Sequence, residues 1–155
     1  MLLRLAAACY GIAATTVGCM AQDSPNDRSV RIAVERRDPV AVEAALAARR
    51  GVEDRDEIGN TPLLIAVGSG QFQIARMLVV GGADIWAHDQ FGVTVGRSIA
   101  ANAYPSGTPE GDAKAALVAD LEARGYEVPG PEPRAVLAMA KRGEWPPRPA
   151  MQGAR

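Results

Sequence analysis

The side chains most capable of chemistry in this chain are few and widely separated. His88 is the only histidine, and Cys9 and Cys19 are the only cysteines. A serine triad, a cysteine–histidine dyad or a histidine–cysteine metal site would have to use His88. Asp54 and Asp56 could form an acid–base pair, but no apolar neighbour would separate their pKa values. The sequence therefore predicts no catalytic residue, no cofactor and no metal ion. For His88 it predicts a position on the surface or in contact with a partner.

Two short motifs allow both a functional and a structural interpretation. Gly68-Ser69-Gly70 suggests a phosphate-binding loop, but it follows a predicted helix and lacks the lysine and the serine or threonine of that motif. A turn between helices is the simpler interpretation. Pro146 and Pro149 have the spacing of a groove-binding ligand, whereas the structural interpretation is an extended, mobile tail, because proline fixes φ and lacks an N–H donor.

Residues 1–21 have the order of a bacterial secretory signal peptide. Arg4 precedes an apolar stretch, Leu5 to Val17, and the segment ends in the small residues Gly18, Cys19 and Ala21. The stretch is shorter than the roughly 20 residues of a membrane-spanning helix, so we expect no permanent transmembrane anchor. Three outcomes remain open: lipidation of Cys19 at a lipoprotein-like sequence, cleavage before Gln22 with soluble release, or retention in the cytosol. Export predicts a periplasmic protein, soluble or lipid-anchored, with no cysteine pair left for a disulfide.

Composition favours one small helical domain. A chain of 155 residues can bury one core, and with aromatic residues at only 5% and abundant alanine, that core must depend on small side chains and close helix contacts. The net charge is -1, and acidic residues alternate with arginines, as in residues 53–57, which we interpret as a solvated loop. No nucleic-acid partner is expected from such a charge distribution.

An internal repeat gives the order of the predicted helices. Asp56, Gly59 and Thr61 recur 33 residues later as Asp89, Gly92 and Thr94. Between them, Thr61 and Pro62 predict the cap and first turn of a helix that runs through Val67. A turn at 68–70 then leads to a second helix, Phe72 to Val80, with Gly82 as its left-handed stop. Each helix has one apolar face, formed by Leu63, Ala66, Ile74, Met77 and Leu78.

The flanking segments have the same pattern in weaker form. Upstream, Asp38-Pro39 predicts the start of a helix through Leu46, with Gly51 as its stop. Downstream, we expect a helix from Val95 to Asn102, an insertion over 103–111, a helix over 112–124 and a last helix over 133–142. Val95-Gly96 stands where the preceding copy has Pro62-Leu63, which weakens both the helix start and the packing.

The 33-residue unit, with its Gly59-Asn60-Thr61-Pro62-Leu63 start and its Gly81-Gly82-Ala83-Asp84 end, resembles an ankyrin repeat. The resemblance covers about residues 28–128 and is strong over 56–94. It implies an all-α fold: a short solenoid of helix–turn–helix pairs with hairpin loops, about three repeats plus a C-terminal capping helix. The expected organisation is a signal peptide at 1–21, an ankyrin-repeat domain at 22–128, the capping helix at 129–143 and a flexible proline-rich tail at 144–155.

The resemblance also implies a binding surface made of hairpin tips and inner helices. Ile58 and Phe91 are the most informative candidates, because an exposed apolar side chain at a hairpin tip reduces solubility unless a partner covers it. The alternative is that each packs against the neighbouring hairpin. Trp86 has the same two interpretations, and the insertion that carries Tyr104 is either a recognition loop or a cover for the third repeat. The full set of predicted partner-binding residues is Glu57, Ile58, Asn60, Ser69, Trp86, His88, Gln90, Phe91, Val93, Asn102 and Tyr104.

Two functions follow from this resemblance. The first is a monomeric, exported adaptor or inhibitor that holds another protein, as small periplasmic ankyrin proteins of the immunity type neutralise delivered toxins. The alternative is a structural or accessory factor, lipid-anchored through Cys19, that supports an envelope enzyme such as catalase. An enzyme with an atypical site is a third class, for which His88 is the best candidate. The sequence does not identify the protein partner.

Overall fold

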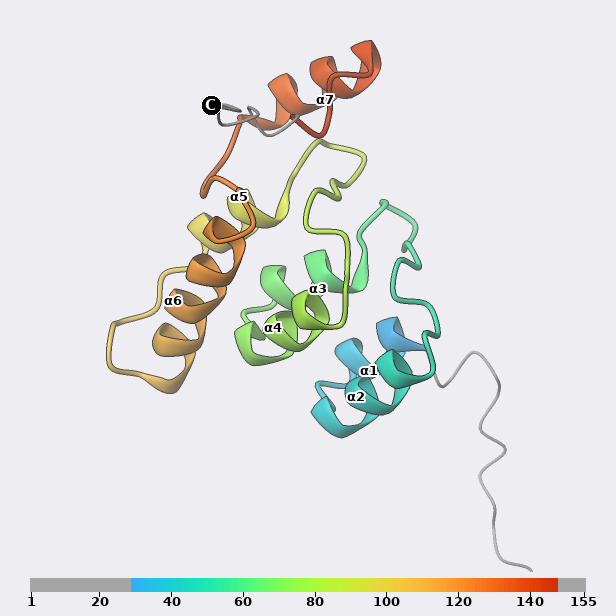
Figure 1. The fold of residues 1–155 in the computed structure, drawn as a ribbon, viewed down its shortest axis with the longest axis vertical. Coiled ribbons are helices and arrows are strands. Elements are labelled where there is room, and N and C mark those ends of the chain that lie inside the picture. The colour runs from blue at the N-terminus through green and yellow to red at the C-terminus, as the bar shows by residue number, and fades with distance from the viewer. Residues whose placement is uncertain (1–28, 148–155) are drawn as a thin grey trace, which may run out of the picture.

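The structure is a computed structural model that describes residues 29–147. Within this range the chain forms seven helices and no strand (Figure 1), as expected for an all-α repeat fold. The helices are α1 (Val30–Glu35), α2 (Pro39–Ala47), α3 (Pro62–Gly68), α4 (Phe72–Val80), α5 (Val95–Ala101), α6 (Pro109–Glu122) and α7 (Pro133–Arg142).

The first six helices form two layers. Helices α1, α3 and α5 follow one another in the inner layer, and α2, α4 and α6 form the outer layer (Figure 1). Helix α1 pairs with α2 and α3 pairs with α4, while α6 packs mainly on α4. The loops between repeats, residues 51–60 and 84–93, extend to the same side as hairpins.

Capping groups predicted from the sequence begin the helices of the first two pairs. The Asp38 carboxylate accepts hydrogen bonds from the N–H groups of Val40 and Ala41, both at 3.0 Å. The Thr61 hydroxyl accepts one from the Leu64 N–H at 3.4 Å. Both helices have proline at the first helical position. An N–H at this position would have no acceptor within the helix, so its absence costs no hydrogen bond. Helix α4 spans the predicted residues, and Gly82 follows it with φ of 88°.

A continuous apolar core runs through the three pairs. Ala33 and Ala66 are both buried and lie 33 residues apart, and Ile32 and Ile65 are both partly buried, so the first two pairs follow the same 33-residue register. Because each pair buries its apolar face against the next pair, no single pair could be stable alone. The largest core side chains are those of Phe72, Leu63, Leu78, Ile99, Leu117, Leu121 and Tyr126.

Two predicted boundaries are wrong. Helix α2 ends at Ala47, and Arg49, with φ of 49°, takes the left-handed position after it, instead of Gly51. The insertion ends at residue 108, not at 111, because the Thr108 hydroxyl accepts a hydrogen bond from the Gly111 N–H at 3.1 Å and Pro109 begins α6. Thr108-Pro109 thus repeats the helix start used at Thr61-Pro62.

Helix α7 has the predicted bounds but covers a hairpin, not a helix pair. A Cβ on Gly92 would lie 2.3 Å from the Pro133 carbonyl oxygen, so the start of α7 lies directly on the hairpin of residues 84–93. Val136 is buried, whereas Leu137 is exposed. Trp145, in the predicted flexible tail, donates its indole N–H to the Trp86 carbonyl oxygen at 2.8 Å.

Several predictions fall on residues that the structure does not describe. These are the signal peptide at 1–21, the lipidation of Cys19 and the tail beyond Pro147. Over residues 29–147, no helix is long and apolar enough to cross a membrane.

Candidate protein-interaction surface

The second and third repeats begin with hairpins of the same geometry. One carboxylate oxygen of Asp56 accepts hydrogen bonds from the N–H groups of Ile58 and Asn60, at 3.0 and 2.8 Å. One oxygen of Asp89 accepts from Phe91 and Val93, both at 2.8 Å. Each aspartate therefore satisfies the backbone donors of a tight turn. The left-handed position of each turn is occupied by a glycine, Gly59 with φ of 86° and Gly92 with φ of 82°.

The two hairpins are also joined to each other. The Arg55 guanidinium donates to the carbonyl oxygens of Gly59 at 2.7 Å and His88 at 2.8 Å. The Gln90 N–H donates to the Ile58 carbonyl oxygen at 3.0 Å. Residues 53–57 are therefore more than a solvated loop, because Arg55 fixes the distance between neighbouring tips. Sequence reasoning missed this role, since an arginine among acidic residues is typical of any solvated surface.

Two carboxyl groups of this loop have shifted pKa values. Burial would raise the pKa of Asp56, but the hydrogen bonds from Asn60, Ile58 and Gly59 outweigh it and lower the pKa below its ordinary value. Burial raises the pKa of Glu53, and the hydrogen bond from the Asp84 N–H, at 2.8 Å, opposes that rise. Asp56 therefore stabilises its hairpin as a carboxylate.

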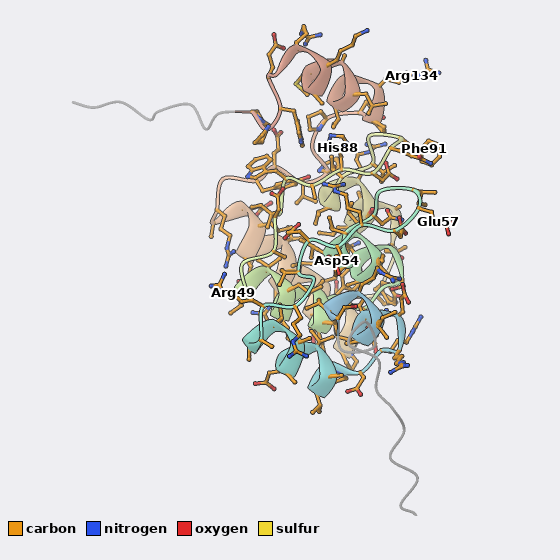
Figure 2. All side chains as sticks on the ribbon, turned by 90° about the vertical axis from the view of Figure 1, so that its right-hand side faces the viewer. Arg49, Asp54, Glu57, His88, Phe91 and Arg134 are labelled. Carbon is orange, nitrogen blue, oxygen red and sulfur yellow. The ribbon has the colours of Figure 1, made fainter. Side chains whose placement is uncertain are left out.

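The hairpin tips expose two large apolar side chains. Phe91 is 59% exposed and Ile58 is 42% exposed, so neither is covered by the neighbouring hairpin. Glu57 and Gln90 beside them are also exposed, and Figure 2 shows Glu57 and Phe91 along one edge of the molecule. Asn60 and Val93 are partly buried, and their backbone groups bind Asp56 and Asp89.

His88 has a structural environment. Its side chain is partly buried, its Nδ1 lies 2.8 Å from the Asp89 carbonyl oxygen, and its own carbonyl oxygen accepts from Arg55. It forms an isolated antiparallel bridge with Thr94 at the base of the hairpin. Among residues 29–147 no group of three or more His, Cys, Asp and Glu side chains is placed to bind a metal ion. His88 therefore helps to hold the hairpin in place.

Trp86 packs locally at the base of the third hairpin. Its ring lies 4.6 Å from the ring of Tyr126 and 5.9 Å from that of Trp145, measured between centroids. Of its two predicted roles, the structure favours local packing over a free anchor for a partner. The sequence did not predict that Trp86 packs on Tyr126 and Trp145, because they lie 40 and 59 positions away along the chain.

The other predicted contact residues lie at the opposite ends of the inner helices. Ser69 follows α3, and its hydroxyl donates to the Ile65 carbonyl oxygen at 2.7 Å. The Asn102 side chain follows α5 and donates to the carbonyl oxygens of Val67 at 3.0 Å and Ser98 at 2.9 Å. Tyr104 packs edge-on against Phe72. The predicted set is therefore divided between the two edges of the solenoid.

Comparison with known proteins agrees with this geometry. Residues 58–90 match the family model described as Ankyrin repeat. This range begins at the tip of one hairpin and ends at the tip of the next, and it contains α3 and α4. No curated protein matches the chain. Repeats of this family are typically non-catalytic and generally bind other proteins. From its hairpins, its layered helix pairs and this match, the chain contains an ankyrin repeat at residues 58–90.

Proposed function

We propose that this protein is a non-catalytic binding module of the cell envelope, acting as an adaptor or inhibitor that holds another protein on its hairpin tips. The observation that carries the proposal is the exposure of Ile58 and Phe91 at neighbouring tips. An exposed apolar side chain is common on any protein. Two of them at equivalent positions, on hairpins joined by Arg55, form a surface that a partner could cover.

Rigidity supports the same proposal. Because Asp56, Asp89 and Arg55 satisfy the backbone groups of both tips, a partner would order few additional groups when it binds. Preorganised surfaces of this kind bind more tightly for the same buried area, since less conformational entropy is lost. Phe91 is the side chain best suited to enter a pocket of the partner, because large aromatic residues commonly carry most of an interface's energy.

Capture from an envelope extract tests the proposal. The immobilised full chain should retain a specific protein, identified by mass spectrometry, and Ile58→Asp with Phe91→Asp should lose it. Val40→Asp with Val80→Asp is the matched control, because each of those valines is 74% exposed and lies on an outer helix. Retention by both double variants, or by neither, would show that the tips are not the binding surface.

The envelope location depends on the segment that ends at Cys19. The mass of the protein after expression in a bacterial host separates the possible outcomes, which are a lipid adduct on Cys19, cleavage before Gln22, or an intact segment. A lipid adduct would favour the alternative function of an anchored accessory factor for an envelope enzyme. An intact segment in the cytosolic fraction would contradict an envelope role altogether.

A further inference from the structure

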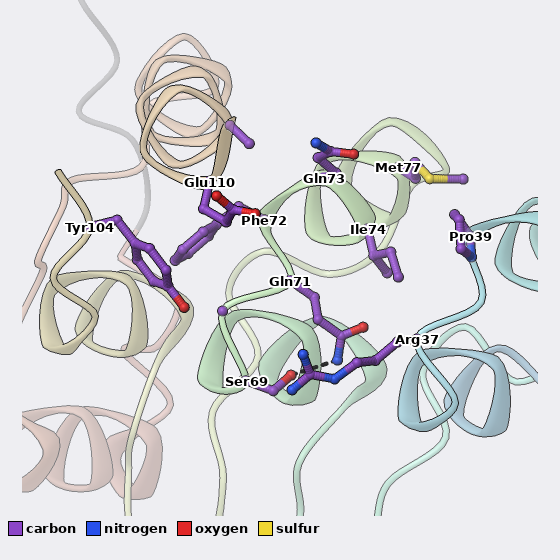
Figure 3. A pocket seen from close by; sticks show the side chains of 12 residues that line it. Arg37, Pro39, Ser69, Gln71, Phe72, Gln73, Ile74, Met77, Tyr104 and Glu110 are labelled. Atoms are coloured by element: carbon purple, nitrogen blue, oxygen red, sulfur yellow. Dashed lines mark hydrogen bonds between the residues drawn. The ribbon is translucent and has the colours of Figure 1, made fainter. Parts of the chain in front are cut away.

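A pocket lies at the edge of the solenoid opposite the hairpin tips. It has a volume of about 540 Å³, within the size range of small-ligand pockets. Three segments line it: the α1–α2 turn at Arg37, the α3–α4 turn at Ser69–Phe72, and the insertion with the start of α6 at Tyr104 and Glu110 (Figure 3). The hairpin surface shares none of these segments.

The floor and one wall of the pocket are apolar. Ile74 and Met77 contribute from α4, and the Tyr104 ring stands edge-on to Phe72 with 5.5 Å between centroids. Tyr104 can approach this closely because Gly70 has no side chain: a Cβ there would lie 2.2 Å from the Tyr104 hydroxyl. The insertion therefore builds a wall for the pocket, which neither interpretation of this loop from sequence included.

A buried acceptor in this pocket has no partner. The Ser69 hydroxyl donates its proton to the Ile65 carbonyl oxygen, so it must accept from the Gln71 side-chain amide, 2.7 Å away. This assignment leaves Gln71 Oε1 as the other end of the amide. That oxygen is buried and has no hydrogen-bond partner. Since a buried acceptor without a donor is unfavourable, the site favours a ligand that brings an N–H or O–H group.

A cation lies beside this acceptor. The side chain of Arg37 extends toward Ser69 and Gln71 in Figure 3, and within residues 29–147 it has no hydrogen-bonded or ionic partner. The lining carries a single opposite charge, Glu110, on the far side of Phe72. One guanidinium facing one distant carboxylate suits a ligand with a single negative charge better than a phosphate, which usually requires several cationic or N–H donors.

We propose that this pocket binds the free carboxyl end of a polypeptide whose last side chain is apolar. The terminal carboxylate pairs with Arg37, the N–H of the last residue donates to Gln71 Oε1, and the apolar side chain lies on Ile74 and Met77 against Tyr104. The three groups of one terminal residue thus match the three features of the pocket. This site is separate from the hairpin tips, so a partner could occupy one surface without the other.

The test uses N-acetyl-glycyl-glycyl-leucine and its C-terminal amide, titrated into the isotope-labelled full chain and followed by nuclear magnetic resonance. We expect the acid to bind with a dissociation constant on the order of 0.1 mM, as for a ligand of about 20 heavy atoms, and to shift the Gln71 side-chain amide signal. The amide should bind about tenfold or more weakly, because it loses the charged hydrogen bond to Arg37.

Arg37→Gln should weaken binding of the acid by a similar factor and leave binding of the amide unchanged. Arg49→Gln is the matched control, because Arg49 is also exposed and has the same left-handed backbone, with φ of 49° against 56° for Arg37, but does not line the pocket. Equal affinity for acid and amide, no effect of Arg37→Gln, or no binding of either peptide would each overturn the proposal. None of these results bears on the hairpin tips, whose capture experiment stands separately.

Discussion

The second and third repeats share a hairpin and differ in the helices that follow it. In both, an aspartate holds the turn and a threonine precedes the first helix. In the second repeat the Thr61 hydroxyl caps α3, and α3 packs directly on α4. In the third, the Thr94 hydroxyl is buried without a hydrogen bond, and α5 and α6 are not among the close helix pairs of residues 29–147.

Tyr126 fills the position that this difference creates. Its hydroxyl accepts a hydrogen bond from the Gly96 N–H at 3.2 Å, and only 2% of its surface is exposed. Gly96 lies where the second repeat has Leu63, and a Cβ on it would lie 2.8 Å from the Tyr126 ring. In the third repeat, the position equivalent to Leu63 has no side chain. Tyr126, which follows α6, fills the space instead. The comparison shows that one hairpin geometry is compatible with two ways of filling the space behind it.

Removing Tyr126 should break the third repeat and have the largest effect. Tyr126→Ala leaves a cavity beside Gly96 and Trp86, and we expect it to lower the free energy of unfolding by about 3–5 kcal/mol. Chemical denaturation of the full chain measures this change. Tyr104→Ala is the control, because Tyr104 is 38% exposed and its loss should be much smaller. Equal losses would contradict the central role of Tyr126.

Restoring a side chain at position 96 should also destabilise the third repeat. The Cβ of Gly96→Ala would lie 2.7 Å from the Pro129 carbonyl oxygen, and such overpacking lowers stability by about 1–3 kcal/mol. Gly68→Ala, on α3, meets no atom within 4 Å and should be neutral or stabilising by up to about 1 kcal/mol. Thermal unfolding of the two variants compares them directly, and a stabilising Gly96→Ala would refute the close approach.

The two threonines should respond differently to the same substitution. Thr61→Val removes a cap and should lower the free energy of unfolding by about 1 kcal/mol. Thr94→Val removes a buried hydroxyl that has no partner, so it should be neutral or slightly stabilising. Valine keeps the branched shape in both cases. A similar loss in both variants, measured by denaturant midpoint, would mean that the two hydroxyls have the same role.

Acid should weaken the second hairpin through Asp56, with the smallest effect of the four. Because folding lowers the pKa of this carboxyl, its stabilisation is complete above about pH 5 and is lost as the pH falls below about 4, through the lowered pKa. The stability difference between the native chain and Asp56→Asn should therefore shrink on acidification. Asp54→Asn, an exposed carboxylate in the same loop, controls for the lost charge. A difference that stayed constant with pH would contradict the assignment.

Most of the helices could be predicted because their signals are local. Thr61-Pro62, Asp38-Pro39 and Gly82 act on backbone groups within a few residues, so their effect depends little on the rest of the chain. The wrong boundaries have a different cause. Arg49 takes a left-handed conformation that sequence rules assign to glycine, and Thr108-Pro109 was interpreted as part of a loop despite carrying the same helix start.

The candidate surface was predictable only in part. The exposure of Ile58 and Phe91 follows from the repeat, since the residue before the turn glycine projects outward in each copy. The division of the set between two edges does not, because it depends on how long the inner helices are and where the chain turns. Trp86 was ambiguous for the same reason: its neighbours Tyr126 and Trp145 are far away in sequence.

The sequence by itself therefore determined the repeat, its period, its helix starts and the hairpin turns, because these depend on φ preferences and on hydrogen bonds between near neighbours. Only the tertiary structure decided which distant side chains meet. Arg55 on His88, Tyr126 on Gly96, Trp145 on Trp86 and Tyr104 over Gly70 each join segments at least 30 residues apart. Such contacts arise when stacked pairs bring separate segments together, and no local pattern records them.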